Sequence, residues 1–409
     1  MNNKKSGYPI NENLIFASFQ GISNGIPEGM ARVMLPILET LQNNNLCFKY
    51  YVSFVKGYDG SINVCEISNT YRIIIKALNI LNHFVLKMPS YKFRFLHERL
   101  YDHFLSHRIK QKSKIISTAH LFKSNLKNKK LGGINILYMS NPDEALLYDL
   151  LNNEKKVHSI NFIDAYTYKK RIDFTIKSTN SYDHIICITS SVFESFSKRI
   201  KKNKLSTSYY YIIPNENIFP KIDLNKNKKL TFIYVGHTVW LKGIYYLLLG
   251  WEKANLLDSQ LLIVGNINET VEYYIKTRFK KLNNVHYIGN TKNTNTLYRS
   301  SHVFISPSLL DAHPTTVSEA MYCGLPAIVS EGCGAKALID EGINGFVVAS
   351  GNADDLANKM IWFNNNKTLI PNMGRKAIET INELEKGNQS NKVAEHMLAV
   401  IESLSKGKN

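Results

Sequence analysis

Two carboxylates in the sequence, Asp311 and Glu319, lie eight residues apart on either side of a predicted helix start. Eight residues is slightly more than two helical turns, so carboxylates at this spacing can share one face. Such a pair can bind the hydroxyl groups of a sugar or a ribose. A Gly-Leu-Pro turn at 324–326 follows directly and predicts where the helix ends.

The helix start between these carboxylates has the features of an anion-binding site. Pro314 suits the first helical position, and the backbone N–H groups of Thr315, Thr316 and Val317 would then lack helical partners. These groups carry the partial positive charge of a helix N-terminus. N–H groups that can bind phosphate, beside carboxylates that can bind hydroxyls, suit a sugar nucleotide.

Three strand-to-glycine turns precede this helix. Gly236 and His237 follow a predicted strand, and Lys242 supplies a positive charge beside the next helix start. Gly265 and Gly289 end two further strands, where a base or ribose could bind the backbone. Each turn alone is common in α/β proteins, and it is their order and spacing that indicate a nucleotide site.

Apolar strands alternate with helices in both halves of the chain, and these elements must position the turns. The expected strands are 14–19, 50–55, 134–139, 157–163, 184–188, 209–213, 230–235, 260–264, 285–288, 303–306, 327–329 and 345–348. The expected helices are 27–43, 71–87, 91–111, 143–152, 190–203, 243–255, 268–282, 294–300, 315–323, 334–341, 353–364 and 388–405. Continuous apolar strands between helices predict parallel sheets covered on both faces. The pattern predicts an α/β protein with two doubly wound, Rossmann-like domains facing a cleft.

The length of 409 residues fits two domains. We expect them at 1–220 and 221–387, because the polar, Pro-bounded segment 214–229 has little periodicity. A C-terminal helix at about 388–409 can pack back on the first domain. No segment has the ~18 apolar residues of a membrane span, and the run at 14–19 is too short for a secretory signal. Five scattered cysteines without a CxxC pair indicate a reducing, cytoplasmic compartment.

The net charge of +18 is concentrated between residues 71 and 130. This segment has fourteen Lys or Arg residues and only two acids, Glu98 and Asp102, so it supplies two-thirds of the net charge. Its interleaved apolar and aromatic residues favour an amphipathic helix pair that contacts an anionic membrane surface. A solvated surface in a Lys/Asn-rich chain explains the same counts equally well. No RNA-binding aromatic motif, zinc finger or helix-turn-helix accompanies the charge, so specific nucleic-acid binding is not predicted.

Residues 232–365 resemble the donor-binding domain of the retaining GT-B glycosyltransferases, the large glycosyltransferase group 1 or family 4. The matching features are the glycine turns, the Lys242-Gly243 pair, the two carboxylates in the family's E-x7-E spacing and the Ala-Met-x-x-Gly-x-Pro run at 320–326. The resemblance implies a GT-B enzyme that transfers a sugar, with retention, from a nucleotide-diphosphate donor to a hydroxyl. A UDP- or GDP-sugar is the expected donor, and no metal or other cofactor is expected.

The basic segment, together with the resemblance, indicates the acceptor and the cellular location. A glycan or lipid-linked acceptor in surface-polysaccharide, lipopolysaccharide or other glycoconjugate synthesis is expected to bind the N-terminal domain. The second domain is expected to bind the donor. Together with the basic segment, these expectations place the enzyme in the cytoplasm, peripherally at the inner membrane face.

Carried over by position, the resemblance implies a role for each motif residue. Asp311 would contact the donor sugar, Glu319 the ribose hydroxyls and Lys242 the diphosphate, and these three form the predicted catalytic set. The amides of Thr315 and Thr316 would cap the distal phosphate. The other predicted donor-binding residues are Gly236, His237, Gly265, Ile288, Gly289, His313 and Pro314. The predicted acceptor and phosphate loop comprises Gly21, Ser23, Asn24 and Gly25, together with Asp164.

The chain departs from the family pattern at several of these positions. His237 replaces an arginine and carries a full charge only when protonated. Asp311 replaces the commoner glutamate and is one methylene shorter, and Pro314 replaces a glycine and removes one amide. Asp164 follows Ile163, where relatives have a histidine. None of these changes removes a group needed by a front-face mechanism, in which the leaving phosphate accepts the acceptor's proton.

Two other functions fit the same features. A sugar-nucleotide epimerase or hydrolase on this fold would yield epimerised nucleotide or free sugar without an acceptor product. A non-catalytic subunit could use the basic surface to hold an anionic polymer. The presence of both Asp311 and Glu319 favours an active transferase over that subunit.

Overall fold

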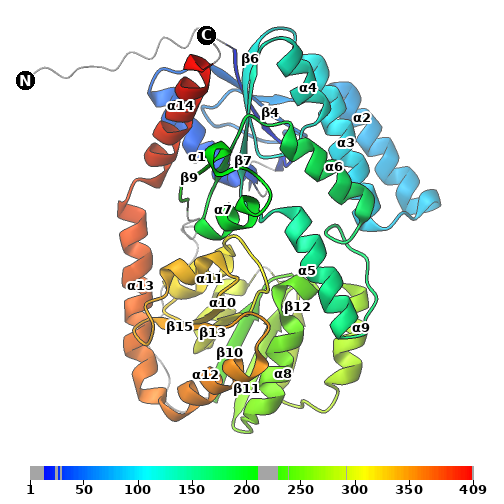
Figure 1. Ribbon diagram of the computed structural model, residues 1–409. Coiled ribbons are helices and arrows are strands. Elements are labelled where there is room, and N and C mark those ends of the chain that lie inside the picture. Colours follow the sequence, from blue (N-terminus) through cyan, green and yellow to red (C-terminus); the bar gives the residue numbers. More distant parts are fainter. Residues whose placement is uncertain are drawn as a thin grey trace, which may run out of the picture.

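Two parallel β-sheets, each covered by helices, form the body of the protein in a computed structural model (Figure 1). The structure describes residues 13–23, 26–27, 30–210, 229–237, 239–291 and 293–407. Residues 214–228 of the predicted linker, and with them the expected boundary between 220 and 221, lie outside these ranges.

The first sheet has seven parallel strands in the order β5-β4-β1-β6-β7-β8-β9. Its strands are β1 (Asn13–Ser18), β4 (Phe48–Val52), β5 (Val64–Glu66), β6 (Ser113–Ser117), β7 (Ile134–Met139), β8 (His184–Cys187) and β9 (Leu205–Thr207). Its helices are α1 (Met30–Asn43), α2 (Asn69–Leu81), α3 (Ser90–Arg108), α4 (Lys123–Lys130), α5 (Glu144–Val157), α6 (Lys169–Asn180) and α7 (Ser190–Ser197). A short antiparallel pair, β2 (Ile22–Ser23) and β3 (Ile26–Pro27), follows β1.

The second sheet has six parallel strands in the order β12-β11-β10-β13-β14-β15. Its strands are β10 (Leu230–Val235), β11 (Ser259–Val264), β12 (Val285–Gly289), β13 (Val303–Ser306), β14 (Ala327–Ser330) and β15 (Gly345–Val348). Its helices are α8 (Ile244–Ala254), α9 (Glu269–Arg278), α10 (Thr294–Ser300), α11 (Thr315–Tyr322), α12 (Ala353–Asn365) and α13 (Ile370–Lys386). The strand order reverses between β10 and β13, and ligands of such sheets bind at the carboxyl ends of the strands beside that point.

The last helix, α14 (Gln389–Lys406), returns to the first domain (Figure 1). It packs against α1, and its buried residues Val393, Met397 and Ile401 belong to the core beneath the first sheet. The last described helix therefore lies on the same domain as the first described strand.

Helix α5 holds the two domains together. Leu147 and Leu151 of this helix are buried in the core of the second domain. The carboxylate of Glu154 accepts hydrogen bonds from the indole N–H of Trp240 and the hydroxyl of Tyr246, both at 2.8 Å. Apolar burial and the carboxylate of Glu154 thus join α5 to the start of the second domain.

The strand predicted at 157–163 was wrong. Helix α5 continues to Val157, and the following residues form no strand. Ile160 and Phe162 are apolar because they pack against the second domain, with the ring of Phe162 stacked on Trp240. Apolar residues at an interdomain contact and in a strand look alike in a sequence.

Other differences lie at short or polar elements. Strand β6 was missed, although all five of its residues are buried at the centre of the sheet. Helix α13 was also missed, and the helix predicted at 334–341 is a 3-10 turn at Gly334–Leu338. Tyr209 and Tyr210 form no strand, and β9 ends the sheet instead. Across the described part of the chain, no helix is both long and apolar enough to cross a membrane.

Candidate functional site

The loops after β10 and β13 meet at the reversal point of the second sheet. Lys242 ends the first loop, and its ammonium group forms an ion pair with the Oδ2 atom of Asp311 from the second. The hydroxyl of Ser308 donates to the same oxygen at 3.4 Å. Burial opposes the charge on Lys242, but attraction to Asp311 outweighs it and raises the lysine pKa above its ordinary value. The site therefore holds a permanent cation beside a carboxylate.

A close backbone contact fixes the two loops against each other. Gly243 has a φ of 73°, and a Cβ atom at this position would lie 1.9 Å from the carbonyl oxygen of Pro307. Only glycine fits such an approach in this conformation. The N–H of Leu309 also donates to the carbonyl of Leu241 at 2.9 Å. Lys242 and Asp311 are thus brought together by the backbones that carry them.

Asp311 lies in extended chain before the helix, and not on a helical face with Glu319. Its N–H donates to the carbonyl of Gly332 and its carbonyl accepts from the N–H of Gly334, both at 2.9 Å. Helix α11 begins only at Thr315. The expectation of a shared helical face was therefore wrong, since the backbone of residues 332–334 and not helical periodicity positions Asp311.

Helix α11 begins at Thr315, as predicted, but Pro314 does not have the predicted role. Pro314 caps the helix with a ψ of 119° instead of occupying its first turn. The N–H of Val317 donates to the carbonyl of Pro314 at 3.1 Å and is not available to a ligand. No hydrogen bond within the described residues engages the N–H groups of Thr315 and Thr316. These two amides remain suited to an anion.

Glu319 and His313 have partners inside the second domain. The buried phenol of Tyr298, on α10, donates to the Oε2 atom of Glu319 at 3.2 Å. Burial and the nearby carboxylate raise the Tyr298 pKa well above 10, so it remains a donor. The imidazole of His313 lies 3.0 Å from the hydroxyl of Ser318, and burial lowers its pKa to about 4. His313 is therefore neutral near pH 7 and adds no positive charge.

The structure brings together the three predicted glycine turns. The N–H of Gly265 donates to the carbonyl of Gly289 at 2.8 Å, and a Cβ atom on Gly265 would lie 2.1 Å from the carbonyl oxygen of Gly236. His237 and Ile288 are exposed at the same strand ends. The carboxyl ends of β10, β11 and β12 thus lie next to one another, beside the loop that carries Lys242.

The predicted acceptor loop follows β1 in the first domain. Gly21 is buried, and a Cβ atom there would lie 2.5 Å from the carbonyl oxygen of Phe54. Ser23 belongs to β2, whereas Asn24 and Gly25 lie outside the described residues. The loop is therefore anchored to the strand edge at its beginning.

Asp164 shapes a turn at the domain interface. Its Oδ1 atom accepts the N–H groups of Tyr166 and Thr167, both at 2.9 Å. Burial raises the pKa of Asp164, and these hydrogen bonds oppose the rise. The turn places Tyr166 close enough to Lys242 for the charge of each group to affect the other's pKa. Asp164 thus connects the first domain to the cation of the second.

A buried charge cluster in the first domain was missed by the sequence analysis. The guanidinium of Arg171 binds Glu98 at 2.9 and 3.0 Å and Glu144 at 2.6 and 3.0 Å. Its fifth N–H donates to the carbonyl of Ala165 at 3.2 Å, next to the Asp164 turn. The three charged residues come from α3, α5 and α6, and no local spacing relates them.

His120 was also missed, and it lies beside this cluster. It follows β6, at the carboxyl edge of the first sheet, with its Nε2 atom 4.0 Å from an oxygen of Glu144. Neither ring nitrogen has a hydrogen-bond partner among the described residues. Burial lowers its pKa more than Glu144 raises it, so the ring is neutral. Recognition of β6 would have drawn attention to a histidine at a strand end.

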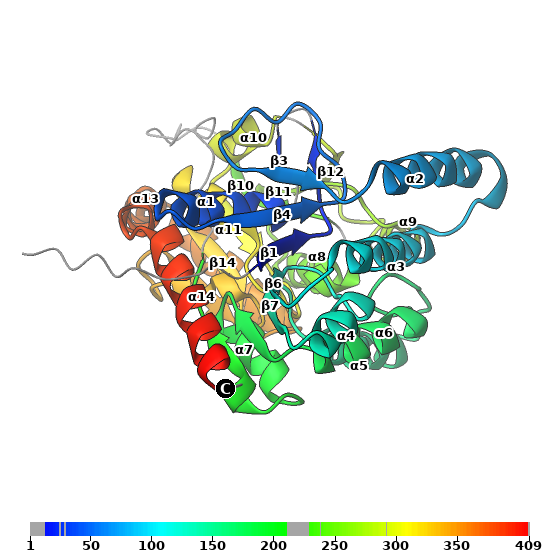
Figure 2. The same ribbon diagram turned by 90° about the horizontal axis from the view of Figure 1, so that it is seen from above.

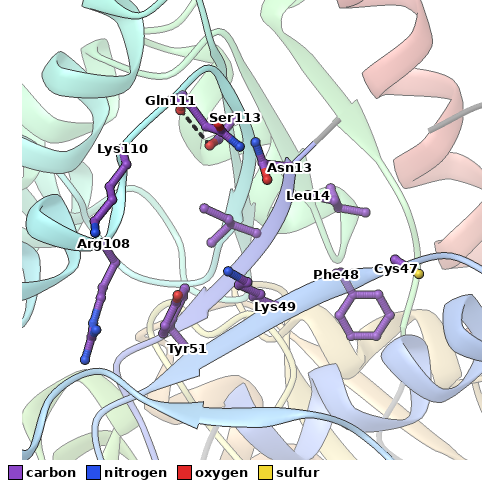
Figure 3. A pocket seen from close by; sticks show the side chains of 11 residues that line it. Asn13, Leu14, Cys47, Phe48, Lys49, Tyr51, Arg108, Lys110, Gln111 and Ser113 are labelled. Carbon is purple, nitrogen blue, oxygen red and sulfur yellow. Dashed lines mark hydrogen bonds between the residues drawn. The ribbon is translucent and has the colours of Figure 1, made fainter. Parts of the chain in front are cut away.

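A cavity of about 450 Å³ lies at the opposite edge of the first sheet (Figure 3). It is lined by the starts of β1, β4 and β6 and by Lys49, Arg108 and Lys110. Ligand loops of parallel sheets follow the carboxyl ends of the strands. This cavity is therefore separate from the site around Lys242.

Comparison with solved structures identifies the architecture. Sucrose-phosphate synthase from Thermosynechococcus elongatus superposes with a TM-score of 0.67 at 15% identity, over 97% of this chain and 100% of that one. Anabaena HepE in complex with UDP-glucose superposes with a TM-score of 0.60 at 14% identity, over 95% and 99%. The chain has the GT-B fold.

Sequence comparisons agree with this fold. The model of the family "Glycosyl transferases group 1" matches residues 215–380. An uncharacterized glycosyltransferase from Haemophilus influenzae is 32% identical over 203 residues, which cover 48% of this chain and 55% of that protein. The N,N'-diacetylbacillosaminyl-diphospho-undecaprenol α-1,3-N-acetylgalactosaminyltransferase of Campylobacter jejuni is 26% identical over 38% of this chain and 41% of its own. The chain thus matches about half the length of these curated relatives.

Proposed function

We propose that this GT-B protein is a retaining glycosyltransferase that moves a sugar from a nucleotide-diphosphate donor to a hydroxyl acceptor. The observation that carries the proposal is the Lys242–Asp311 pair at the reversal point of the second sheet, beside the N-terminus of α11. The likeness to a GT-B structure that holds UDP-glucose supports a UDP-sugar as donor.

Each group has a task that follows from its chemistry. The three N–H groups of the Lys242 ammonium allow it to keep Asp311 and still bind an oxygen of the donor diphosphate. The amides of Thr315 and Thr316 bind the distal phosphate, and Glu319, held by Tyr298, binds the ribose hydroxyls. Asp311 orients the sugar's own hydroxyls.

The transfer itself needs no group from the protein to accept a proton. The bond between the anomeric carbon and the β-phosphate oxygen breaks, and the acceptor oxygen bonds to the same carbon from the same face. The acceptor's proton passes to the leaving phosphate. Lys242 and the α11 amides stabilise the negative charge that develops on that phosphate, so the reaction proceeds without a metal.

The acceptor binds the first domain, where His120 and the loop after β1 reach the carboxyl edge of the sheet. The neutral ring of His120 has no hydrogen-bond partner among the described residues and can bind a hydroxyl. The Campylobacter relative is named for a diphospho-undecaprenol substrate, which supports a lipid-linked acceptor in glycoconjugate synthesis. Such an acceptor places the enzyme at the inner face of the cytoplasmic membrane.

A thermal-shift panel of UDP-, GDP-, ADP- and CMP-sugars tests the donor. We expect one nucleotide class to raise the melting temperature of the wild-type protein. Lys242→Met is expected to abolish that shift and to lower kcat/KM on the order of a hundredfold, because it removes the cation that faces the leaving phosphate. Lys253→Met is the matched control, since Lys253 pairs with Asp354 on the surface of the same domain.

Product analysis separates this proposal from its rivals. A transferase yields a glycosylated acceptor whose new bond has the anomeric configuration of the donor. Epimerised nucleotide or free sugar as the only product would instead indicate an epimerase or hydrolase. Failure of all four nucleotide classes to stabilise the protein would favour a binding subunit.

A further inference from the structure

The α2–α3 hairpin has an apolar surface that no described residue covers. Of the large hydrophobic side chains exposed on the protein, six fall between residues 73 and 86: Ile73, Ile80, Leu81, Phe84, Val85 and Leu86, at 42–71% exposure. Single exposed hydrophobics are ordinary, whereas a contiguous group marks an interaction surface. Figure 2 shows α2 extending away from the body of the first domain.

The residue spacing and the turn of the hairpin place these apolar side chains on one face. Ile73, Ile80 and Phe84 follow one another at intervals of seven and four residues, which places them on one helical face. Helix α2 continues as a π-helical turn at Asn82–Leu86, and Lys87 closes it in a left-handed conformation with φ of 43°. The side chain of Asn82 accepts the N–H of Met88 at 2.7 Å. The tip is therefore a defined turn that displays its apolar side chains.

The charges around this surface indicate its partner. Residues 69–97 contain five Lys or Arg residues and no acid. Arg72 pairs with Glu66 and Arg94 with Glu98, whereas Lys76, Lys87 and Lys92 are exposed and form no ion pair with the described residues. Pairing of two such hairpins would bring like charges together, while anionic lipid phosphates would be attracted.

We propose that the α2–α3 hairpin docks the protein on an anionic phospholipid bilayer. Ile80, Phe84 and Val85 enter the boundary between headgroups and acyl chains, and the lysines contact lipid phosphates. The inference deepens the proposed function and rests on it in one respect, because it names the surface on which a lipid-linked acceptor would lie.

Close to its tip, the α3 arm of the hairpin contacts a turn beside the candidate site. The rings of Tyr91 and Phe95 on α3 contact Tyr168, with centroids 5.2 and 6.0 Å apart. Tyr168 precedes α6 and lies two residues from Tyr166, which is near Lys242. Glu98, one turn further along α3, binds Arg171. A docked hairpin would therefore hold the Asp164–Tyr168 turn, and the site beside it, close to the bilayer.

Vesicle binding of the full chain, measured without donor or acceptor, tests this proposal independently of transferase activity. Co-sedimentation with vesicles containing phosphatidylglycerol is compared with pure phosphatidylcholine vesicles. We expect at least tenfold stronger binding to the anionic vesicles. Replacing Lys76, Lys87 and Lys92 by glutamine should weaken it on the order of a hundredfold. Equal binding to both vesicle types, or no binding at low salt, would overturn the proposal.

The apolar contribution is tested with a matched pair of variants. Serine at Ile80, Phe84 and Val85 should weaken binding on the order of a hundredfold. Serine at Leu257, Tyr273 and Ile343, which are 53–77% exposed on the second domain, should change it less than twofold. Equal losses in both variants would contradict docking through the hairpin, as would a dimer in light scattering that only the hairpin variant dissociates.

A fluorescent reporter tests the insertion of the tip into the bilayer even if the serine variant folds poorly. Phe84→Trp places an indole at the tip, while the three native tryptophans lie in the second domain, with Trp240 and Trp251 buried and Trp362 half-buried, so the wild-type spectrum is the reference. Anionic vesicles should shift the emission of this variant to the blue and expose it to quenching by brominated lipids. An unchanged spectrum with vesicle-bound protein would refute insertion of the tip.

Discussion

The two domains hold their charged residues in different ways. In the second domain, backbone contacts join the loops that carry Lys242 and Asp311, through the approach of Gly243 to Pro307. In the first, side chains from three helices assemble the Glu98–Arg171–Glu144 cluster. Charged groups fixed by their own backbone leave a glycine-rich signature along the chain. Groups assembled from distant helices leave none, and their geometry depends on long-range packing.

The largest expected effect is on the side-chain cluster. Arg171→Met leaves Glu144 buried without its cation and leaves Glu98 with Arg94 alone, which should destabilise the protein by about 3–5 kcal/mol. Urea unfolding measures the loss. Arg199→Met is the matched control: Arg199 also binds a carboxylate, Asp143, through two hydrogen bonds, but it is partly exposed.

For the control we expect a loss of about 1–2 kcal/mol. Adding Glu98→Gln and Glu144→Gln to Arg171→Met should restore part of the stability, because the repelling charges are gone. Equal losses in Arg171→Met and Arg199→Met would mean that the buried cluster has no special role in the first domain.

The same contrast explains how much the sequence predicts. Strands β10, β13 and β15 match their predicted bounds, and Lys242, Asp311 and Glu319 fall in the predicted loops and helix of the second domain. In that domain the glycine turns follow strands directly, and Lys242 and Asp311 lie in the loops after β10 and β13, so periodicity and glycines locate them. The GT-B fold follows from the repetition of such units.

The structure of the first domain is harder to predict because its sequence patterns fit more than one kind of structure. The β6 strand contains only two large apolar residues, Ile115 and Ile116, between lysine-rich flanks, so it resembles a solvated segment. Because β6 was not predicted, the position of His120 after a strand end was not predicted either. Arg171 is 27 residues from Glu144 and 73 from Glu98, and its partners are set only by the packing of α3, α5 and α6.

A second prediction tests the backbone contact in the second domain. Gly243→Ala should cost about 3–4 kcal/mol, since it combines a left-handed φ with a clash against the Pro307 carbonyl. Gly342→Ala is the control: its φ is 74°, but no heavy atom lies within 4 Å of the added Cβ. It should cost about 1 kcal/mol. Thermal or urea unfolding that shows the same loss for both variants would exclude a structural role for the loop contact.

The third prediction concerns the pH dependence of the stability of the second domain. Burial lowers the pKa of His313 to about 4, against about 6.5 in an unfolded chain. The neutral ring is therefore stabilising above pH 6.5, and this contribution is lost as the pH falls from 6.5 to 4. The full loss amounts to about 3 kcal/mol.

Urea unfolding at several pH values between 7 and 4 measures this dependence. His313→Gln should flatten the curve in that window, because the variant has no group there to titrate. Carboxylates contribute to both curves at the acid end, so the difference between wild type and variant is the quantity to compare. Parallel curves would show that His313 does not titrate as its burial requires.

The smallest expected effect separates stability from binding. Tyr298 and Tyr101 are both buried, and the hydroxyl of Tyr101 donates to the carbonyl of Tyr51 at 2.9 Å in the first domain. Phenylalanine at either position should cost about 1 kcal/mol of stability. Only Tyr298→Phe should also weaken nucleotide-sugar binding, by roughly fivefold, because Glu319 then loses its hydrogen bond from Tyr298. Titration calorimetry on both variants measures the affinity for the nucleotide sugar. An unchanged affinity in both variants would show that Glu319 does not need the hydrogen bond from Tyr298 to bind the ribose.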